Sequence, residues 1–219
     1  MRLLTIGNDA KTVKGHKKGV RTAILYLSPT TISGRNFCPW SSAGCRAACL
    51  NTAGRGIMTN VQQARLERSK LLNLNGDAFM AALKGEIAMF AALTSRSGLI
   101  PAVRLNGTSD LDWGDVIDSF PHIQFYDYTK SLRRVIDNRR KNYWLTFSRS
   151  ETNHDDCISA LEAGFNVAAV FANRPRRYEG FPVIDGDDTD VRFMDPQGVW
   201  VGLSPKGKAK KDMTGFVIR

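Results

Sequence analysis

Three of the four cysteines of this chain lie close together in one short stretch. Cys38, Cys45 and Cys49 form the pattern C-x6-C-x3-C within N-F-C-P-W-S-S-A-G-C-R-A-A-C-L. Thiolates are soft ligands, and close spacing lets one loop surround one metal centre. A closed structural zinc site needs four ligands, so three thiolates with one open position favour an iron-sulfur cluster of the 4Fe-4S type.

The fourth cysteine, Cys157, is far from this group in the sequence. It lies in D-D-C-I-S-A-L-E-A-G, in the first turn of a predicted helix and on the same side as Ala160 and Leu161. A buried core thiol is the commoner role for a cysteine in such a place. Its position just after a strand leaves a role as fourth metal ligand open, so both interpretations are kept.

Composition places the chain among ordinary globular proteins. It has 219 residues, of which 42% are hydrophobic and 24% are charged, and we expect one domain over 1–219. There is no run of eighteen apolar residues and the N-terminal apolar run is too short for a signal peptide, so we expect a cytoplasmic protein without a membrane partner. A reducing compartment favours metal binding over disulfides for a tight cysteine group.

The formal net charge is +10, and the basic residues are grouped along the sequence. Such an excess attracts polyanions, with nucleic acid as one candidate partner, or helps to bind a small anionic substrate. For any single group a solvated surface is the commoner explanation. Three of the groups are Arg133, Arg134, Arg139, Arg140 and Lys141; Arg174, Arg176 and Arg177; and Lys206, Lys208, Lys210 and Lys211.

Short apolar runs alternate with helical patterns along most of the chain. The predicted strands are 22–28, 102–105, 123–128, 143–148 and 167–171. The predicted helices are 59–73, 77–93 with Asp77 as N-cap, 115–120, 131–138 with Ser131 as N-cap, and 153–164. This order predicts an α/β fold with a mainly parallel sheet, rolled into a partial (β/α) barrel. We expect 1–21 to be an N-terminal loop or edge segment, 22–172 the β/α core, and 173–219 an irregular, basic closing segment or lid. Within the last of these, F-P-V-I-D-G and V-W-V-G-L are predicted short strands.

Polar side chains gather where the predicted strands end, and the cysteine loop follows the first of them. Ligands of parallel α/β folds bind at the carboxyl ends of strands. Asp127 and Glu151 are the candidate general acids or bases, and Lys130 is a candidate catalytic cation. The candidate substrate-binding residues are Arg104, Asn106, Ser109, Asp110, Tyr126, Tyr128, Thr146 and Ser148. Structural roles as helix caps, packing residues or backbone partners remain the alternatives.

An acidic stretch, I-D-G-D-D-T-D, contains Asp185, Asp187, Asp188 and Asp190. It resembles a calcium-binding loop only superficially, because its glycine comes too early and no glutamate closes it. We therefore predict a solvated turn.

Longer motifs identify a family resemblance. The chain resembles the phage-associated gene product 88 family through C-P-W-S-S-A-G-C-R-A-A-C-L, V-R-L-N-G-T-S-D, F-Y-D-Y-T-K, L-T-F-S-R-S-E-T-N and K-G-K-A-K-K-D-M-T-G-F-V. More distantly, a first strand followed by a three-cysteine loop is similar to radical S-adenosylmethionine enzymes. That similarity implies a 4Fe-4S cluster at the mouth of a partial barrel. Those enzymes use C-x3-C-x2-C and a Gly-Gly-Glu segment, and this chain departs from both patterns, so it implies the cluster more strongly than S-adenosylmethionine.

The residues thus lead to one main hypothesis and one rival. We expect an iron-sulfur enzyme of phage type whose open iron faces a polar cavity and does either radical or redox chemistry, or Lewis-acid hydrolysis or dehydration of a small anionic substrate. The rival is a zinc-stabilised, basic nucleic-acid-binding protein that is not an enzyme.

Overall fold

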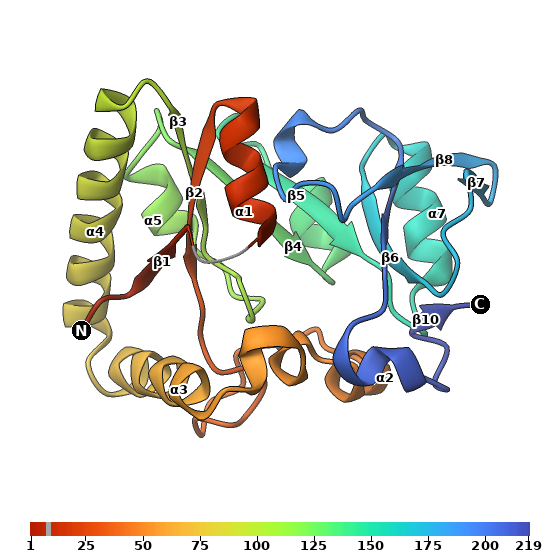
Figure 1. Cartoon of the computed structure of the whole chain (residues 1–219), viewed down its shortest axis with the longest axis horizontal. Helices are drawn as coiled ribbons and strands as arrows, with labels where there is room; N and C mark the ends of the chain where they lie inside the picture. Colours follow the sequence, from red (N-terminus) through yellow and green to blue (C-terminus); the bar gives the residue numbers. More distant parts are fainter. Residues whose placement is uncertain (8–9) are drawn as a thin grey trace.

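The chain folds around one mixed, mostly parallel sheet (Figure 1). The computed structural model describes residues 1–7 and 10–219; Asn8 and Asp9 of the predicted N-terminal segment lie outside the described residues. The strand order is β1-β2-β3-β4-β5-β6-β9-β8-β7, with β10 also paired to β6. The strands are β1 Leu4–Ile6, β2 Val20–Leu25, β3 Ile100–Arg104, β4 Gln124–Thr129, β5 Tyr143–Ser148, β6 Val167–Phe171, β7 Arg177–Tyr178, β8 Phe181–Asp185, β9 Trp200–Leu203 and β10 Val217–Ile218.

Helices connect the strands and cover the sheet. The α-helices are α1 Ala10–Gly15, α2 Ala43–Ala47, α3 Thr59–Leu74, α4 Gly76–Arg96, α5 Gly114–Asp118, α6 Leu132–Ile136 and α7 His154–Glu162. The 3-10 helices are η1 His16–Lys18, η2 Leu50–Thr52, η3 Gly54–Ile57, η4 Arg192–Met194 and η5 Gly207–Lys211. In Figure 1, α2 and α3 lie below the sheet, at the end where β2 leads into the cysteine loop.

The five strands predicted from apolar runs are all present as β2 to β6. They are neighbours in sequence order and pair in parallel, which confirms the α/β class and the mainly parallel sheet. The sheet is open: β1 and β7 end the strand order, and no pairing joins these two edges within the described residues. The first residues supply β1, which pairs antiparallel to β2 at the edge.

One face of the sheet is covered by helices and holds the main core, and we call it the helix-covered face. Strand residues such as Val103, Phe125 and Phe147 pack there against α4, α5, α6 and α7. Helix α4 is long and apolar enough to cross a membrane by length and composition alone. Core helices meet the same criterion, and α4 buries Phe79 and Leu83 completely within this core, so its apolar character is accounted for by packing.

The opposite face is more polar, and we call it the polar face. Because side chains alternate along a strand and paired residues point the same way, the register places five polar residues on it, four of which are predicted site residues and one of which, Thr22, is not. They are Thr22, Arg104, Tyr126, Tyr128 and Thr146. A small apolar group of Val20, Ala102, Tyr126 and Val191 fills part of this face. The face therefore has a packed part and a polar part.

The chain after β6 returns to the sheet instead of forming a separate lid. The predicted short strands F-P-V-I-D and V-W-V-G-L are present as β8 and β9, and β9 pairs in parallel with β6. The last strand, β10, also pairs with β6. Between them, Ala209 of η5 and Val217 of β10 pack against Ala48 in the cysteine loop. This closing segment thus joins the sheet to the cysteine loop.

Two predicted helix starts were tested by the local geometry. The side chain of Ser131 accepts the Arg134 N–H and caps α6 as expected. Asp77 was a predicted cap for α4, but Asn75 holds that position and accepts the Ala78 N–H at 3.1 Å. The prediction was wrong because Gly76 already belongs to the helix, which leaves Asp77 in its first turn.

Candidate functional site

The cysteine loop lies against the carboxyl end of β3. Cys38 Sγ accepts the Thr30 N–H at 3.4 Å and donates to the Thr108 carbonyl at 3.6 Å. The Asp110 N–H donates to the Phe37 carbonyl at 2.8 Å, and Phe37 is completely buried. The loop that leaves β2 is thereby fixed to the loop that leaves β3.

Glu151, just beyond β5, holds the other side of the cysteine loop. Its carboxylate accepts the Gly44 N–H at 2.7 Å and the Ser42 hydroxyl at 2.7 Å. Ser42 in turn caps α2 by accepting the Cys45 N–H at 3.1 Å. These hydrogen bonds lower the pKa of Glu151 although partial burial opposes them. Glu151 is therefore ionised, and the hydrogen bonds that it accepts hold the loop that carries Cys45.

The three thiols of the loop influence one another. All three are half-buried and free of disulfides. Burial raises the pKa of the Cys38 thiol to about 11; the Thr30 N–H opposes this rise, and Cys49 and Cys45 add to it. Burial also raises the pKa of Cys49, while Arg65 and Lys130 act in the opposite direction. The three thiols thus share one loop, and the charges of Arg65 and Lys130 act on Cys49.

Cys157 has a different environment. It is completely buried within the main core, and its Sγ donates to Asn153 Oδ1 at 3.6 Å. Burial raises its pKa to about 12, and Arg149 and Lys130 counteract that rise. The core position predicted for this thiol is confirmed, and the charge effect of Lys130 reaches both Cys157 and Cys49.

Asp190 organises the polar face. Its carboxylate accepts Arg104 NH1 at 2.9 Å, the Tyr128 hydroxyl at 3.3 Å and the Tyr126 hydroxyl at 3.4 Å. The Arg104 guanidinium also lies over the Tyr128 ring, 4.7 Å from its centroid. Burial lowers the pKa of Arg104, but Asp190 and the tyrosines raise it by more. The structure thus brings the predicted residues Arg104, Tyr126 and Tyr128 together around one carboxylate.

The prediction of a solvated turn was wrong for Asp190. This residue is only 6% exposed, because the chain turns inward at Thr189 and continues into η4 across the polar face. Asp185 and Asp188 are exposed, in keeping with the prediction. Sequence reasoning therefore missed Asp190, and it also gave no role to Arg192, which is 1% exposed.

Asp127 belongs to a separate buried network. Its carboxylate accepts the Asn106 N–H at 2.8 Å and the Tyr143 hydroxyl at 3.3 Å. The Asn106 side chain accepts the Ser109 hydroxyl and the Leu111 N–H, each at 2.9 Å. Burial raises the pKa of Asp127 to about 7, although Arg104 and the Asn106 N–H lower it. Asn106, Ser109 and Asp127 are thus tied to the loop after β3.

Asp110 and Lys130 link the exits of β3 and β4. The Asp110 carboxylate accepts the Lys130 N–H at 2.9 Å and Arg134 NH1 at 2.5 Å. Burial raises the pKa of Asp110, and these two partners lower it. The Lys130 ammonium lies 5.7 Å from the centroid of the Phe216 ring. Lys130 is therefore held beside the cysteine loop by its own backbone and by the closing segment.

The last two predicted residues, Thr146 and Ser148, lie two positions apart on β5. Thr146 is completely buried, and its register partner on β4 is Tyr128. Ser148 is half-buried at the strand end, where its carbonyl accepts Asn153 Nδ2 at 3.1 Å. By alternation both side chains lie on the polar face, Ser148 nearer the cysteine loop.

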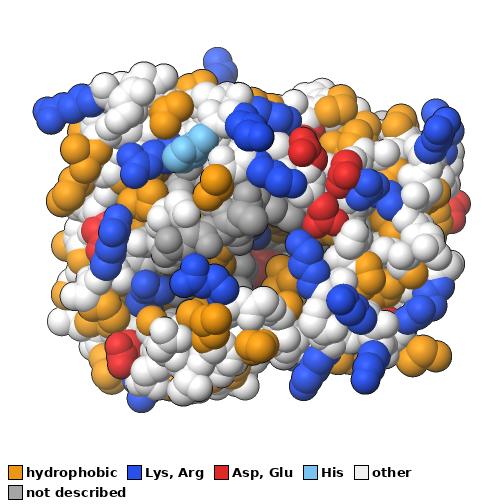
Figure 2. Space-filling model, in the orientation of Figure 1, with side chains coloured by type: hydrophobic (Ala, Val, Ile, Leu, Met, Phe, Trp, Pro, Cys, Tyr) orange, Lys and Arg blue, Asp and Glu red, His pale blue; other side chains and the backbone are white. Residues whose placement is uncertain are grey.

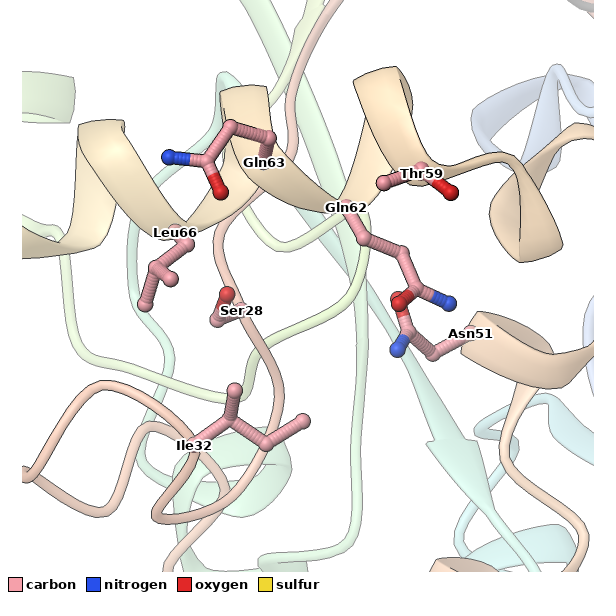
Figure 3. A pocket seen from close by; sticks show the side chains of 7 residues that line it. All are labelled: Ser28, Ile32, Asn51, Thr59, Gln62, Gln63 and Leu66. Carbon is pink, nitrogen blue, oxygen red and sulfur yellow. The ribbon is translucent and has the colours of Figure 1, made fainter.

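The surface has two features near these groups. Figure 2 shows a hollow near the centre of one face, with lysine and arginine side chains around it. A separate cavity of about 180 Å³ lies between α3 and the cysteine loop (Figure 3). Its lining is uncharged, but its Asn51 accepts Arg65 NH1 at 2.5 Å. The Arg65 guanidinium also lies 5.0 Å from the Tyr26 ring centroid. Arg65 is therefore next to this cavity, and its charge acts on Cys49.

Comparison with known families agrees with the motifs. The model of the family described as gene product 88 matches residues 2–219. The chain belongs to the gene product 88 family. No curated protein and no solved structure matches it, so the resemblance to radical S-adenosylmethionine enzymes gains no support. For this gene product 88 protein, the site has to be understood from its own residues.

Replacing Asp190 by Ala should strongly destabilise the fold. The substitution leaves a buried Arg104 guanidinium without its carboxylate, and breaking a buried ion pair in this way costs about 3–5 kcal/mol. Urea unfolding of this variant measures the loss. Asp188→Ala is the matched control, because the exposed Asp188 lies two residues away and should change stability by less than about 0.5 kcal/mol. Equal effects of the two substitutions would contradict the role given to Asp190.

Asp127 should make stability depend on pH. Its folded pKa of about 7 exceeds the ordinary value of 3.8, so the folded chain holds this proton more tightly than the unfolded chain. The free energy of unfolding contributed by this group is therefore greatest in acid, falls as pH rises from about 4 to about 7, and is level above that range.

Asp127→Asn keeps the side-chain shape and removes the titration. Unfolding in urea at about pH 5 and about pH 8 should show a smaller loss of stability for this variant than for the wild type. Asp77→Asn, at an exposed position, controls for the loss of one acid. An unchanged difference between the two pH values in Asp127→Asn would refute a raised pKa.

Proposed function

We propose that this protein binds an iron-sulfur cluster through Cys38, Cys45 and Cys49 and uses it on a small anionic substrate. The observation that carries the proposal is the C-x6-C-x3-C loop, which hydrogen bonds with Thr30, Thr108 and Glu151 hold over the carboxyl ends of β3 and β5. The charges of Arg65 and Lys130 also act on Cys49. A cluster held by thiolates carries net negative charge, and neighbouring cations stabilise it. The same cations favour an anionic substrate next to it.

The donor set fits a cluster better than a single zinc ion. Zinc draws its ligands to about 2.3 Å from one point. Among residues 1–7 and 10–219, no three His, Cys, Asp or Glu side chains stand in an arrangement that would hold a metal ion. An iron-sulfur cluster with one open iron takes three cysteine ligands, which is the number that this loop supplies. Metal binding displaces thiol protons, so the raised pKa values of Cys38 and Cys49 oppose it, and the charges of Arg65 and Lys130 counteract that effect at Cys49.

The chain supplies three functions around such a centre. When bound, a cluster with an open iron supplies either one-electron transfer or Lewis-acid polarisation, as in hydrolysis or dehydration. Lys130 provides a positive charge beside Cys49, Arg65 a second one, and Glu151 positions the loop through Gly44. The consecutive order of β2 to β6 supports a partial barrel whose carboxyl ends collect these groups.

The candidate acids and bases have different roles in this proposal. Glu151 is ionised and engaged by Ser42 and Gly44, which favours positioning over proton transfer. Asp127 has a pKa suited to proton transfer at neutral pH, but it is completely buried. Lys130 is therefore the residue we assign to substrate contact.

Iron analysis of protein purified without oxygen tests the proposal. We expect a brown protein with about four iron atoms per chain and an EPR signal after reduction. Cys38→Ala, Cys45→Ala and Cys49→Ala should each lose most of the iron and the visible absorption, because each removes one of three ligands.

Cys157→Ala is the matched control for these variants. Its thiol is bonded to Asn153 within the core, so this variant should keep its iron. Loss of iron in Cys157→Ala would make that cysteine the fourth ligand and close the site. A colourless wild-type protein carrying one zinc per chain would overturn the proposal. Cleavage of S-adenosylmethionine by the reduced protein would select radical chemistry over Lewis-acid chemistry.

A second candidate function is nucleic-acid binding by a basic, zinc-stabilised protein. The observation that favours it is the exposure of Arg46 on α2 and of Lys208, Lys210 and Lys211 on η5, two elements whose neighbouring residues Ala48 and Ala209 pack together. Binding through these cations would weaken steeply with salt. A gel shift at low and high salt separates this candidate from the first.

A further inference from the structure

Buried donors on the polar face lack acceptors. Arg104 Nε, Arg192 Nε and the Thr146 hydroxyl are buried, and each is without a hydrogen-bond partner among the residues that the structure describes. Thr146 is 0% exposed and Arg192 is 1% exposed. Leaving such a group unsatisfied costs about 1–3 kcal/mol, and most buried polar groups in native proteins have a partner. Three such donors on the polar face therefore indicate that a ligand binds there.

The three donors are neighbours. Thr146 is the register partner of Tyr128, and the Arg104 guanidinium lies 4.7 Å from the Tyr128 ring centroid. Arg192 belongs to η4, which contacts β5, and its charge acts on the Tyr128 hydroxyl together with that of Arg104. Arg104 and Thr146 thus lie beside Tyr128, and η4 brings Arg192 to β5, the strand that carries Thr146.

The carboxylates nearby do not satisfy these donors. Asp190 takes up Arg104 NH1 and the two tyrosine hydroxyls, while Asp127 Oδ1 stays 3.9 Å from Arg104 Nε. Asp195 Oδ2 lies 3.2 Å from Arg192 NH1, and Arg192 NH2 donates to the Thr189 carbonyl. In Arg104 the Nε–H is left over, and in Arg192 both Nε and NH1 are without a hydrogen-bond partner in the described chain. Two N–H groups and a hydroxyl call for a ligand that offers oxygen acceptors.

We infer that the polar face holds a binding site for a small oxyanion, a carboxylate or a phosphate group, with Arg104 Nε, Arg192 Nε and Thr146 Oγ1 as its donors. Asp190 is a positioning residue, because it accepts Arg104 NH1 and so fixes the guanidinium that carries Nε. As the place of the substrate's anionic group, the site rests on the proposed function. As a binding site it is independent of iron, since none of its donors is a cysteine.

Removal of the Thr146 hydroxyl tests the site. Calorimetric titration of the anaerobically purified full chain with inorganic phosphate and with acetate, at constant ionic strength, should show saturable binding of at least one anion. Thr146→Val removes one hydrogen bond to a charged group, so affinity should fall roughly 10- to 100-fold. Thr146→Ser keeps the hydroxyl and should retain binding. Comparing the two titrations identifies carboxylate or phosphate as the preferred group.

Thr94 provides a matched control. Its hydroxyl is also buried and without a partner in the described chain, but it lies on α4, on the helix-covered side of the sheet. Thr94→Val should bind the anion as the wild type does. No saturable binding of either anion, or the same affinity in Thr146→Val as in Thr94→Val, would overturn the inference. Iron content measured on the same samples reports separately on the proposed cluster.

Discussion

The ion pair between Asp190 and Arg104 is the interaction on which the polar face depends. A guanidinium in this position, with its side chain 14% exposed, is stable only if a carboxylate and further hydrogen bonds replace the water that it has lost. Asp190 provides that carboxylate, and the hydroxyls of Tyr126 and Tyr128 complete its shell. Asp190 orients the side chains of Arg104, Tyr126 and Tyr128 together. The segment before η4, which carries Asp190, therefore determines how the polar face is arranged.

The cysteine loop depends on a second long-range carboxylate. Glu151 is more than a hundred residues from Ser42 and Gly44 in the sequence, yet it accepts hydrogen bonds from both. Without this contact, a five-residue helix such as α2 would have little reason to stay folded, since short helices are marginal alone. The hydrogen bonds that Glu151 accepts therefore explain how a loop with half-buried thiols holds one conformation above the ends of β3 and β5.

The sequence was informative wherever the signal is local. Runs such as Val167–Phe171 predict strands because both faces are buried, and the five strands predicted in this way are present as β2 to β6. Asp190 has no such signal, since its partner Arg104 is 86 residues away and the residues around Asp190 in the sequence predict a turn. The role of Glu151 was equally invisible, because its partners come from the loop that precedes it by more than a hundred residues. Position along a strand predicted which side chains share a face, but not which of them would find partners.

Gly44 shows why the cysteine site belongs to the whole fold. A Cβ at this position would lie 2.5 Å from Thr214 Oγ1 and 2.6 Å from Glu151 Oε2, so the backbone next to Cys45 approaches both the closing segment and the exit of β5. Ala48, between Cys45 and Cys49, packs on Ala209 and Val217 of the same closing segment. The thiol positions are therefore complete only after the last residues of the chain have joined β6. A metal site that forms only in the folded state converts binding energy into folding energy. A cluster bound here would therefore stabilise the contact between the cysteine loop and the closing segment.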